Sequence, residues 1–272
     1  MYQQDKCERN VMVALWCAVL TAPAGAQVWS ANEVQLLHGT RYQEPYNPNP
    51  VSKRILTLQH ASGYEWGRVF GFVDMLDSNA QERNLSGQPE SPQEIYGEGY
   101  VTVSLSHALQ RNLSVGIIKD VGLTVGVNAG NKNSQLHPNP RVYLAGVTVD
   151  FAVPRGFFNV DVLGYRDNGC YQGIQQCPDY HATYQITPAW AVPFTVGNQA
   201  WEFTGFADFI GSRGQDTVAQ ILTQPQIRVD LGKHWGQPGR LYAGIEYQYW
   251  RNKFGVQGVN EHHPQALLAV KF

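Results

Sequence analysis

Charged and aromatic side chains alternate with apolar ones along residues 54–76, and this stretch predicts two β-strands joined by a tight turn. In the second of these strands, one face carries Arg68, Phe70, Phe72 and Asp74. The positions between them are glycine or apolar, and successive side chains of a strand point to opposite faces. A face that mixes rings with formal charges suits a water-filled interior better than a dry core. Rings offer stacking surfaces and carboxylates accept hydrogen bonds, so this face predicts binding of a small, polar, flat molecule such as a nucleoside or a sugar.

The same alternation recurs along most of the chain and predicts twelve strands, at residues 33–42, 54–62, 65–76, 95–106, 113–128, 142–152, 157–166, 182–192, 200–210, 224–231, 240–250 and 264–272. The polar faces of these strands add further candidates for the interior: Glu98, Tyr100, Asp120, Asp150, Asp161, Tyr165, Glu202, Asp208, Arg228, Asp230, Glu246 and Trp250. Small barrels also fill their interiors with side chains, so the alternative is a salt-bridged plug that holds a narrow barrel together.

The connections between the predicted strands alternate in length. Residues 43–53, 77–94, 129–141, 167–181, 211–223 and 251–263 are long and polar, whereas the connections between them are shorter. Outer-membrane barrels have short periplasmic turns and long extracellular loops, and a strand edge left open in hydrocarbon would leave costly unpaired backbone groups. We therefore expect an all-β fold, a closed antiparallel transmembrane β-barrel of twelve strands with short periplasmic turns and long extracellular loops.

Residues 1–26 have the features of a cleaved secretory signal. Lys6 and Arg9 precede an apolar run at residues 11–20, and small residues at 24–26 form a cleavage pattern. The apolar run is shorter than the roughly 20 residues of a transmembrane helix. We therefore expect a signal peptide at 1–26, a barrel at 27–272, and a bacterial outer-membrane location. The formal net charge of −2 provides no basic field, so we expect no nucleic-acid partner.

Cys170 and Cys177 flank a short polar segment and remain after removal of the signal. In an oxidising compartment this spacing favours a loop disulfide. His181 and Asp179 lie nearby, but the spacing matches no standard metal site, so we expect no metal and no cofactor.

Serine and histidine also occur close together, as they do in some outer-membrane lipid hydrolases. The candidates are Ser104 or Ser106 beside His107, and His60 followed by Ser62. A hydrolytic triad needs a base that is oriented by a third group, and the sequence indicates no such group for either pair. We therefore expect that the chain is not an enzyme.

Short motifs in order along the chain resemble the Tsx/OmpK family of outer-membrane proteins. They are Thr40-Arg41-Tyr42, the strands 54–61 and 66–74 with Gly71-Phe72-Val73-Asp74, the pair Lys119-Asp120, Gly205-Phe206-Ala207-Asp208, and the terminal Phe272. The resemblance implies a monomeric twelve-stranded barrel with a narrow channel for nucleosides. It further implies that Tyr42 is a stacking ring with Arg41 near it, that Phe72 and Asp74 supply a ring and an acceptor, and that Glu98, Lys119 and Asp120 make polar contacts.

Together these observations predict a passive outer-membrane channel for nucleosides or similar small polar solutes, surrounded by outer-membrane lipid. Phe272 resembles the terminal residue that such barrels present to the barrel-assembly machinery. Two alternatives remain: a less selective pore, and a receptor-type barrel that binds a phage, a colicin or an adhesion partner through its loops.

Overall fold

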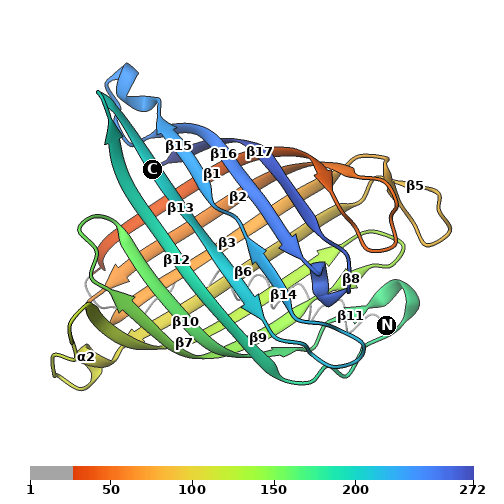
Figure 1. Cartoon of the computed structure of the whole chain (residues 1–272), viewed down its shortest axis with the longest axis horizontal. Helices are drawn as coiled ribbons and strands as arrows, with labels where there is room; N and C mark the ends of the chain where they lie inside the picture. The colour runs from red at the N-terminus through yellow and green to blue at the C-terminus, as the bar shows by residue number, and fades with distance from the viewer. Residues whose placement is uncertain (1–26) are drawn as a thin grey trace.

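The computed structural model describes residues 27–272 and shows a closed, antiparallel β-barrel (Figure 1). The main sheet has thirteen strand segments, but β14 and β15 both lie between β13 and β16 and are the two halves of one strand, which leaves twelve strands. The predicted strand number and fold class are confirmed. The expected signal peptide, residues 1–26, lies outside the described residues.

The strands of the barrel are β1 (Gln27–Tyr42), β2 (Val51–Tyr64), β3 (Gly67–Ser78), β6 (Gln93–Ser104), β7 (Ile118–Lys132), β9 (Arg141–Phe151), β10 (Phe157–Asp167), β12 (Thr183–Val196), β13 (Gln199–Ile210), β14 (Gln220–Thr223) with β15 (Gln226–Asp230), β16 (Leu241–Arg251) and β17 (Glu261–Lys271). Shorter elements lie in the connections: β4 (Glu82–Arg83), β5 (Pro89–Glu90), α2 (Leu105–Ala108), β8 (Pro138–Asn139), β11 (Cys170–Tyr171), and the 3-10 turns η1 (Gln172–Ile174), η2 (Gly232–Trp235) and η3 (Lys253–Gly255). None of the helices in residues 27–272 is both long enough and apolar enough to cross a membrane.

Each strand pairs with its neighbours in chain order, and β1 pairs with β17 to close the barrel. This seam is in register from Glu33 opposite Lys271 to His38 opposite Ala266. Leu36 and Leu37 on β1 lie opposite Leu268 and Leu267 on β17, so the seam closes with apolar contacts on both faces of the sheet.

The connections separate into two ends, which we call the turn end and the loop end. The turn end, on the left of Figure 1, holds residues 65–66, 105–117, 152–156, 197–198 and 231–240, and the loop end holds 43–50, 79–92, 133–140, 168–182, 211–219 and 252–260. The predicted strict alternation of long and short connections is wrong at 231–240 and at 105–117, each of which is longer than four of the six connections at the loop end. Ser104 caps the short helix α2 there, and the predicted strand start at residue 113 is replaced by a turn in which Val115 pairs with Ile118.

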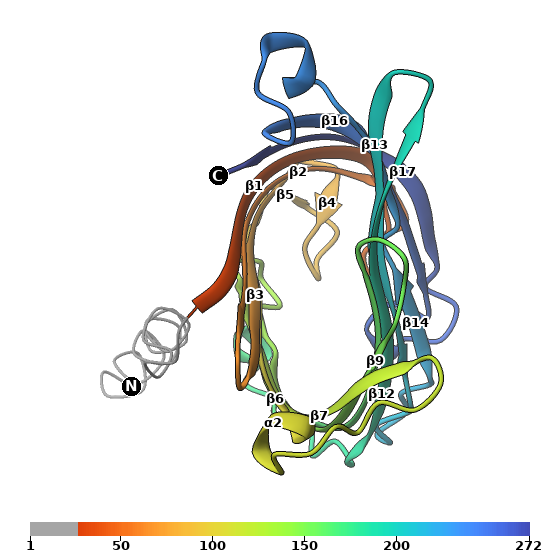
Figure 2. The same ribbon diagram turned by 90° about the vertical axis from the view of Figure 1, so that its left-hand side faces the viewer.

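Side chains alternate between the outside and the inside of the barrel. On β17, Leu268 and Val270 are about half exposed, whereas Leu267 and Ala269 are buried. Viewed from the turn end, the ribbon outlines an oval, with β3 on one long side and β12 and β14 on the other (Figure 2). The oval interior brings facing walls together, so inward side chains are able to bond across it.

Two apolar clusters lie among the inward-facing residues. One joins Leu37, Tyr42, Ile55 and Leu267, and the other joins Leu144, Leu163, Tyr165 and Ile210. The remaining inward positions carry carboxylates, amides, hydroxyls and a few cations. The interior therefore consists of patches of different chemistry rather than one uniform lining.

Candidate functional site

Aromatic rings line the inner face of β3 and β6. Phe70 and Phe72 lie 6.3 Å apart between ring centroids, and Phe72 lies 6.3 Å from Tyr96. Asp74, Phe72 and Phe70 occupy successive inward positions of β3, because the alternation of the strand is unbroken there. All three rings are partly exposed. The wall therefore offers a series of ring faces and edges to a molecule in the lumen.

Carboxylates beside these rings bond to neutral donors. Asp74 accepts a hydrogen bond from Thr57 at 2.6 Å. Glu98 accepts hydrogen bonds from Tyr96 at 2.6 Å and from Tyr100 at 2.8 Å. Glu98 also accepts a hydrogen bond from the Asn128 amide at 3.1 Å. A carboxylate has about four acceptor positions, so both carboxylates keep capacity for the hydroxyl or amino group of a solute.

A further carboxylate of this type faces them from β13. Asp208 accepts hydrogen bonds from Thr187 at 2.5 Å and from Gln185 at 3.2 Å. Close by, three threonines on β6, β7 and β9, Thr102, Thr124 and Thr148, are linked hydroxyl to hydroxyl. This part of the interior is rich in hydroxyl groups and poor in cations, which suits exchange of hydrogen bonds with a sugar hydroxyl or a base edge.

The wall around the seam is held by ion pairs instead. Arg228 on β15 lies 2.6 Å from Glu33 on β1 and 2.7 Å from Glu202 on β13, and Lys271 lies 2.9 Å from Glu202. Glu246 accepts hydrogen bonds from the amides of Gln226 and Gln265. These groups satisfy one another, so this wall matches the salt-bridged plug that was the alternative for the whole interior.

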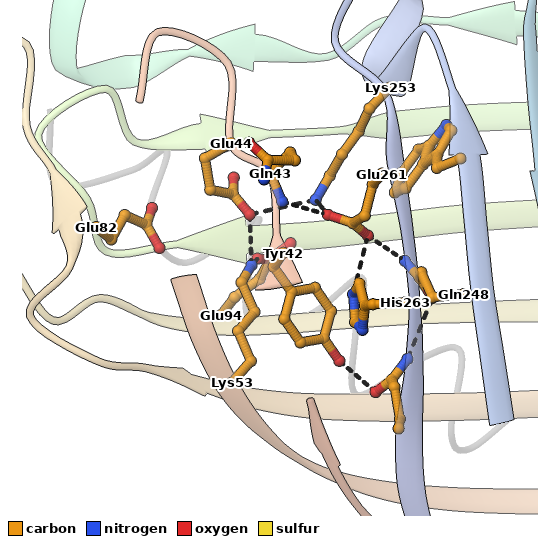
Figure 3. Close-up of polar contacts among 12 residues, drawn as sticks. Tyr42, Gln43, Glu44, Lys53, Glu82, Glu94, Gln248, Lys253, Glu261 and His263 are labelled. Atoms are coloured by element: carbon orange, nitrogen blue, oxygen red, sulfur yellow. Dashed lines mark hydrogen bonds and ion pairs between the residues drawn. The ribbon is translucent and has the colours of Figure 1, made fainter. Parts of the chain in front are cut away.

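A larger network, which we call the Glu44 cluster, lies at the loop end (Figure 3). Glu44 follows β1 in the loop 43–50, and its carboxylate lies 2.6 Å from Lys53, 3.1 Å from Lys132 and 3.3 Å from Lys253. The lysines come from β2, β7 and η3, which are separate parts of the barrel wall and mouth. The other members are Glu82, Glu94 and Glu261, which pair with the same lysines.

The three lysines determine the protonation of Glu44. Burial alone would raise the pKa of its carboxyl, but the ammonium groups of Lys253, Lys53 and Lys132 more than offset this and hold the pKa well below its usual value. Glu44 is therefore ionised at neutral pH. Glu44, a loop residue, thus links β2, β7 and η3 through ion pairs.

Tyr42 lies directly inside this cluster. Its ring packs edge-on against His263 at 4.4 Å, with Lys53 5.4 Å above the ring, and its hydroxyl donates to Gln265. The ring is 2% exposed and faces the interior as expected, but protein groups already cover its faces. In this conformation Tyr42 therefore packs within the mouth of the lumen and offers no free ring face to a solute.

Two of the predicted lumen residues lie elsewhere. Arg41 is exposed, because a β-bulge between Gly39 and Tyr42 shifts the alternation and turns Arg41 away from the interior. Lys119 is also exposed, since it alternates with Asp120 at the turn end. Their assignment to the channel lining is wrong.

The other predicted residues face the interior but differ in their surroundings. Asp120 accepts hydrogen bonds from Ser104 and Ser106 and fastens the turn around α2. Arg68 pairs with Asp150 at 2.7 Å near the turn end. Trp250 donates to Gln220 and packs against Phe254 near the loop end. Phe70, Phe72, Asp74, Glu98 and Tyr100 lie together on the wall of β3 and β6. The remaining predicted residues are distributed along the barrel.

Several lumen residues were not anticipated. Lys53, Lys132 and Glu261 lie just outside the predicted strand ends, so alternation extended by a few residues would have found them. No strand pattern would have found Glu44, because it lies in a loop. The structure also joins Cys170 to Cys177 by a disulfide in the loop 168–182. Within residues 27–272 no group of three or more His, Cys, Asp or Glu side chains is arranged to hold a metal ion.

The sequence matches one known family over most of its length. Residues 29–268 match the family model described as nucleoside-specific channel-forming protein, Tsx. The chain belongs to the Tsx family. This membership and the closed barrel together place the chain in the bacterial outer membrane and among channels.

More distant similarities are found among solved structures. The translocator domain of the autotransporter NalP from Neisseria meningitidis is 13% identical, with 99% of this chain and 95% of that chain covered and a TM-score of 0.43. The β domain of the Bordetella autotransporter BrkA is 9% identical, with 89% and 98% covered and a TM-score of 0.39. No individual curated protein matches this chain.

Proposed function

We propose that this member of the Tsx family is a passive channel that binds and conducts nucleosides. The family assignment supplies the solute class, and the wall of β3 and β6 carries the proposal within the molecule. There Phe72 and Tyr96 offer rings beside Asp74 and Glu98, whose carboxylates bond to neutral hydroxyls. A nucleoside needs a stacking surface for its base and acceptors for its sugar hydroxyls, and this wall supplies both.

The proposed orientation places the loop end outside the cell and the turn end in the periplasm. It follows the general pattern of outer-membrane barrels, and both termini of the described chain lie at the turn end. A solute would then pass the Glu44 cluster first and the wall of rings and carboxylates second.

The deciding experiment is planar-bilayer conductance of the purified protein, titrated with nucleosides and, as controls, with sugars of similar size. We expect saturable block by nucleosides only. A current that none of the solutes blocks would indicate a general pore and would contradict the proposal.

Two substitutions test the wall itself. We expect Phe72→Ala and Asp74→Ala each to weaken nucleoside block by about tenfold, the effect of losing one stacking contact or one hydrogen bond worth about 1–3 kcal/mol. The matched control is Phe209→Ala, because Phe209 faces outward and is 41% exposed. Unchanged block in both lumen variants would remove these residues from the binding site.

A receptor-type barrel is the second candidate, and a cleft between two loops favours it. Tyr46, Asn49, Arg83 and Leu85 line a cleft of about 450 Å³ between loops 43–50 and 79–92, and Tyr46 is 82% exposed. Phage or colicin binding would use such loop surfaces. The absence of any conductance, both in the native protein and after removal of the Glu44 charge, would favour this candidate over the channel.

A further inference from the structure

A serine, a histidine and an asparagine lie in line on the outer wall of the barrel, near the turn end. His60 Nδ1 lies 2.8 Å from Asn32 Oδ1, and His60 Nε2 lies 3.0 Å from Ser62 Oγ. His60 and Ser62 are two residues apart on β2 and share a face, and Asn32 lies opposite His60 in the register with β1. The neighbour of Asn32, Glu33, binds Arg228 in the lumen, so Asn32 and its partners face outward.

The order of these contacts is that of a hydrolytic triad. An amide oxygen only accepts hydrogen bonds, so Nδ1 has to carry the proton, and this tautomer leaves Nε2 as the acceptor that faces the serine hydroxyl. Asn32 therefore orients the imidazole, and His60 is positioned to act as a base toward Ser62. The sequence indicated the His60–Ser62 pair but no orienting group, which only the pairing of β1 with β2 supplies.

We propose that Ser62, His60 and Asn32 form an esterase centre that acts on the acyl ester of a glycerophospholipid in the adjacent leaflet. The wall next to the triad is apolar: Val34 and Leu36 on β1 face outward with Leu58 on β2. Acyl chains would lie along these residues and present their ester carbonyl near the level of the triad. The esterase proposal rests on the proposed function in one respect: the orientation proposed there makes the adjacent leaflet the periplasmic one.

A tyrosine beside the nucleophile covers it and accepts a hydrogen bond from Ser62 in this conformation. Tyr64 Oη lies 3.3 Å from Ser62 Oγ, and the Tyr64 ring stacks on Trp66 at 5.0 Å between centroids. The indole N–H of Trp66 is buried and bonds to no described group. Ser62 is fully buried, so the Tyr64 ring has to swing away before an ester reaches Oγ. The centre is closed in this conformation, and Tyr64 is its cover.

The reaction needs only water as a second reactant. Ser62 Oγ attacks the ester carbonyl while its proton passes to His60 Nε2, and the bond from the carbonyl carbon to the glycerol oxygen breaks as that oxygen takes the proton from His60. The acyl group is then on Ser62 Oγ. Water gives a proton to His60 and adds to the acyl carbon, after which Oγ leaves and recovers the proton, so that a fatty acid and a lysophospholipid are released.

The first test uses a fluorescent fluorophosphonate, which reacts with serines that a base has activated. We expect labelling of the folded full-length protein at Ser62, located by mass spectrometry, and loss of the label in Ser62→Ala. His60→Ala should lower the labelling rate by about 100-fold, the contribution of a general base. Tyr64→Ala should raise it, because the cover is removed.

The matched control is Ser30→Ala. Ser30 lies directly opposite Ser62 in register on β1 and is exposed, but it has no hydrogen bond to an imidazole in the described part of the chain. Labelling governed by exposure alone would select Ser30, and such a result would overturn the proposal. So would the absence of any label at Ser62 in both the native protein and Tyr64→Ala.

A second measurement tests Asn32 and the substrate class. Asn32→Ala should slow labelling and Asn32→Asp should restore it, because a carboxylate orients the imidazole in the same way. Fatty-acid release from phosphatidylethanolamine in mixed micelles should follow the same order of variants. Labelling without release would exclude the phospholipid as substrate. Nucleoside block measured on Ser62→Ala keeps this result separate from the channel proposal.

Discussion

Glu44 illustrates how one loop carboxylate can hold the mouth of a barrel. It is 8% exposed and has three lysine partners, of which Lys53 and Lys253 are each 3% exposed. Breaking a buried ion pair by removing one partner leaves an uncompensated charge and costs about 3–5 kcal/mol. The stability of the mouth should therefore depend on this one side chain far more than on any exposed ion pair, such as Arg54 with Asp77.

We predict that Glu44→Gln lowers the free energy of unfolding by about 3–5 kcal/mol. The three lysines would lose their shared counter-charge, so the variant should also conduct anions better relative to cations. Denaturant titration and the reversal potential in a salt gradient measure the two effects. Glu65→Gln, at an exposed turn residue, is the control. Equal stability of both variants would show that the cluster does not hold the mouth.

The pH dependence of this contribution follows from the direction of the pKa shift. The pKa of Glu44 is lower in the folded protein than its ordinary value of 4.5, so its contribution is complete above pH 4.5 and is lost as the pH falls through the folded-state pKa. We therefore expect the difference in unfolding free energy between the native protein and Glu44→Gln to be constant above pH 4.5 and to shrink below it. Unfolding titrations of both proteins across this range measure the difference. A difference that already shrinks above pH 4.5 would contradict the assignment.

Among the elements, the strand formed by β14 and β15 is interrupted at Gln224-Pro225, where Pro225 has no N–H for the ladder. The partner strand β13 has Gly205 next to this interruption, and the φ of Gly205 is +151°. A Cβ atom at this position would lie only 2.7 Å from the Gln224 carbonyl oxygen. The two strands remain joined because Thr223 and Gln224 both donate to the Phe206 carbonyl. The strand interruption at Gln224-Pro225 therefore requires a glycine at position 205, because a side chain there would collide with its backbone.

We predict that Gly205→Ala destabilises the barrel by at least about 1–2 kcal/mol, the cost of placing a Cβ in this backbone region, with a further cost from the contact with Gln224. Gly164→Ala is the control, since its Cβ would meet the Ala145 carbonyl oxygen at an ordinary 3.5 Å. The yield of folded barrel and the denaturation midpoint measure both variants. Equal midpoints would show that the strand interruption adjusts without cost.

The strands could be predicted from the sequence because a barrel wall imposes a period of two residues on every strand. The interior contacts could be predicted only in part, since they depend on where a bulge shifts that period, as at Arg41, and on which loops fold inward, as Glu44 does. The outer-wall triad shows a third limit. Its histidine and serine lay in a predicted strand, but Asn32 lay one residue outside one, and only the pairing of β1 with β2 brings it to His60.

At the scale of the whole molecule, the two ends of the barrel differ in what they expose to a reagent outside the cell. We predict that a cysteine introduced by Ser86→Cys at the loop end reacts with a membrane-impermeant maleimide on intact cells. A cysteine introduced by Gln110→Cys at the turn end should react only after permeabilisation. Cys170 and Cys177 are paired and do not compete for the reagent. The opposite pattern would reverse the proposed orientation.

The seam between β1 and β17 gives the chain an order of assembly. Every other pairing in the barrel wall joins strands that follow one another around the wall in chain order, whereas this one joins residues 33–38 to residues 266–271. The contact that removes the last open edge therefore becomes possible only when residues 266–271 have been synthesised. A product shortened by a premature stop would retain most of the wall but would leave unpaired the edge of β1 that otherwise bonds to β17, and it would present this edge to proteases.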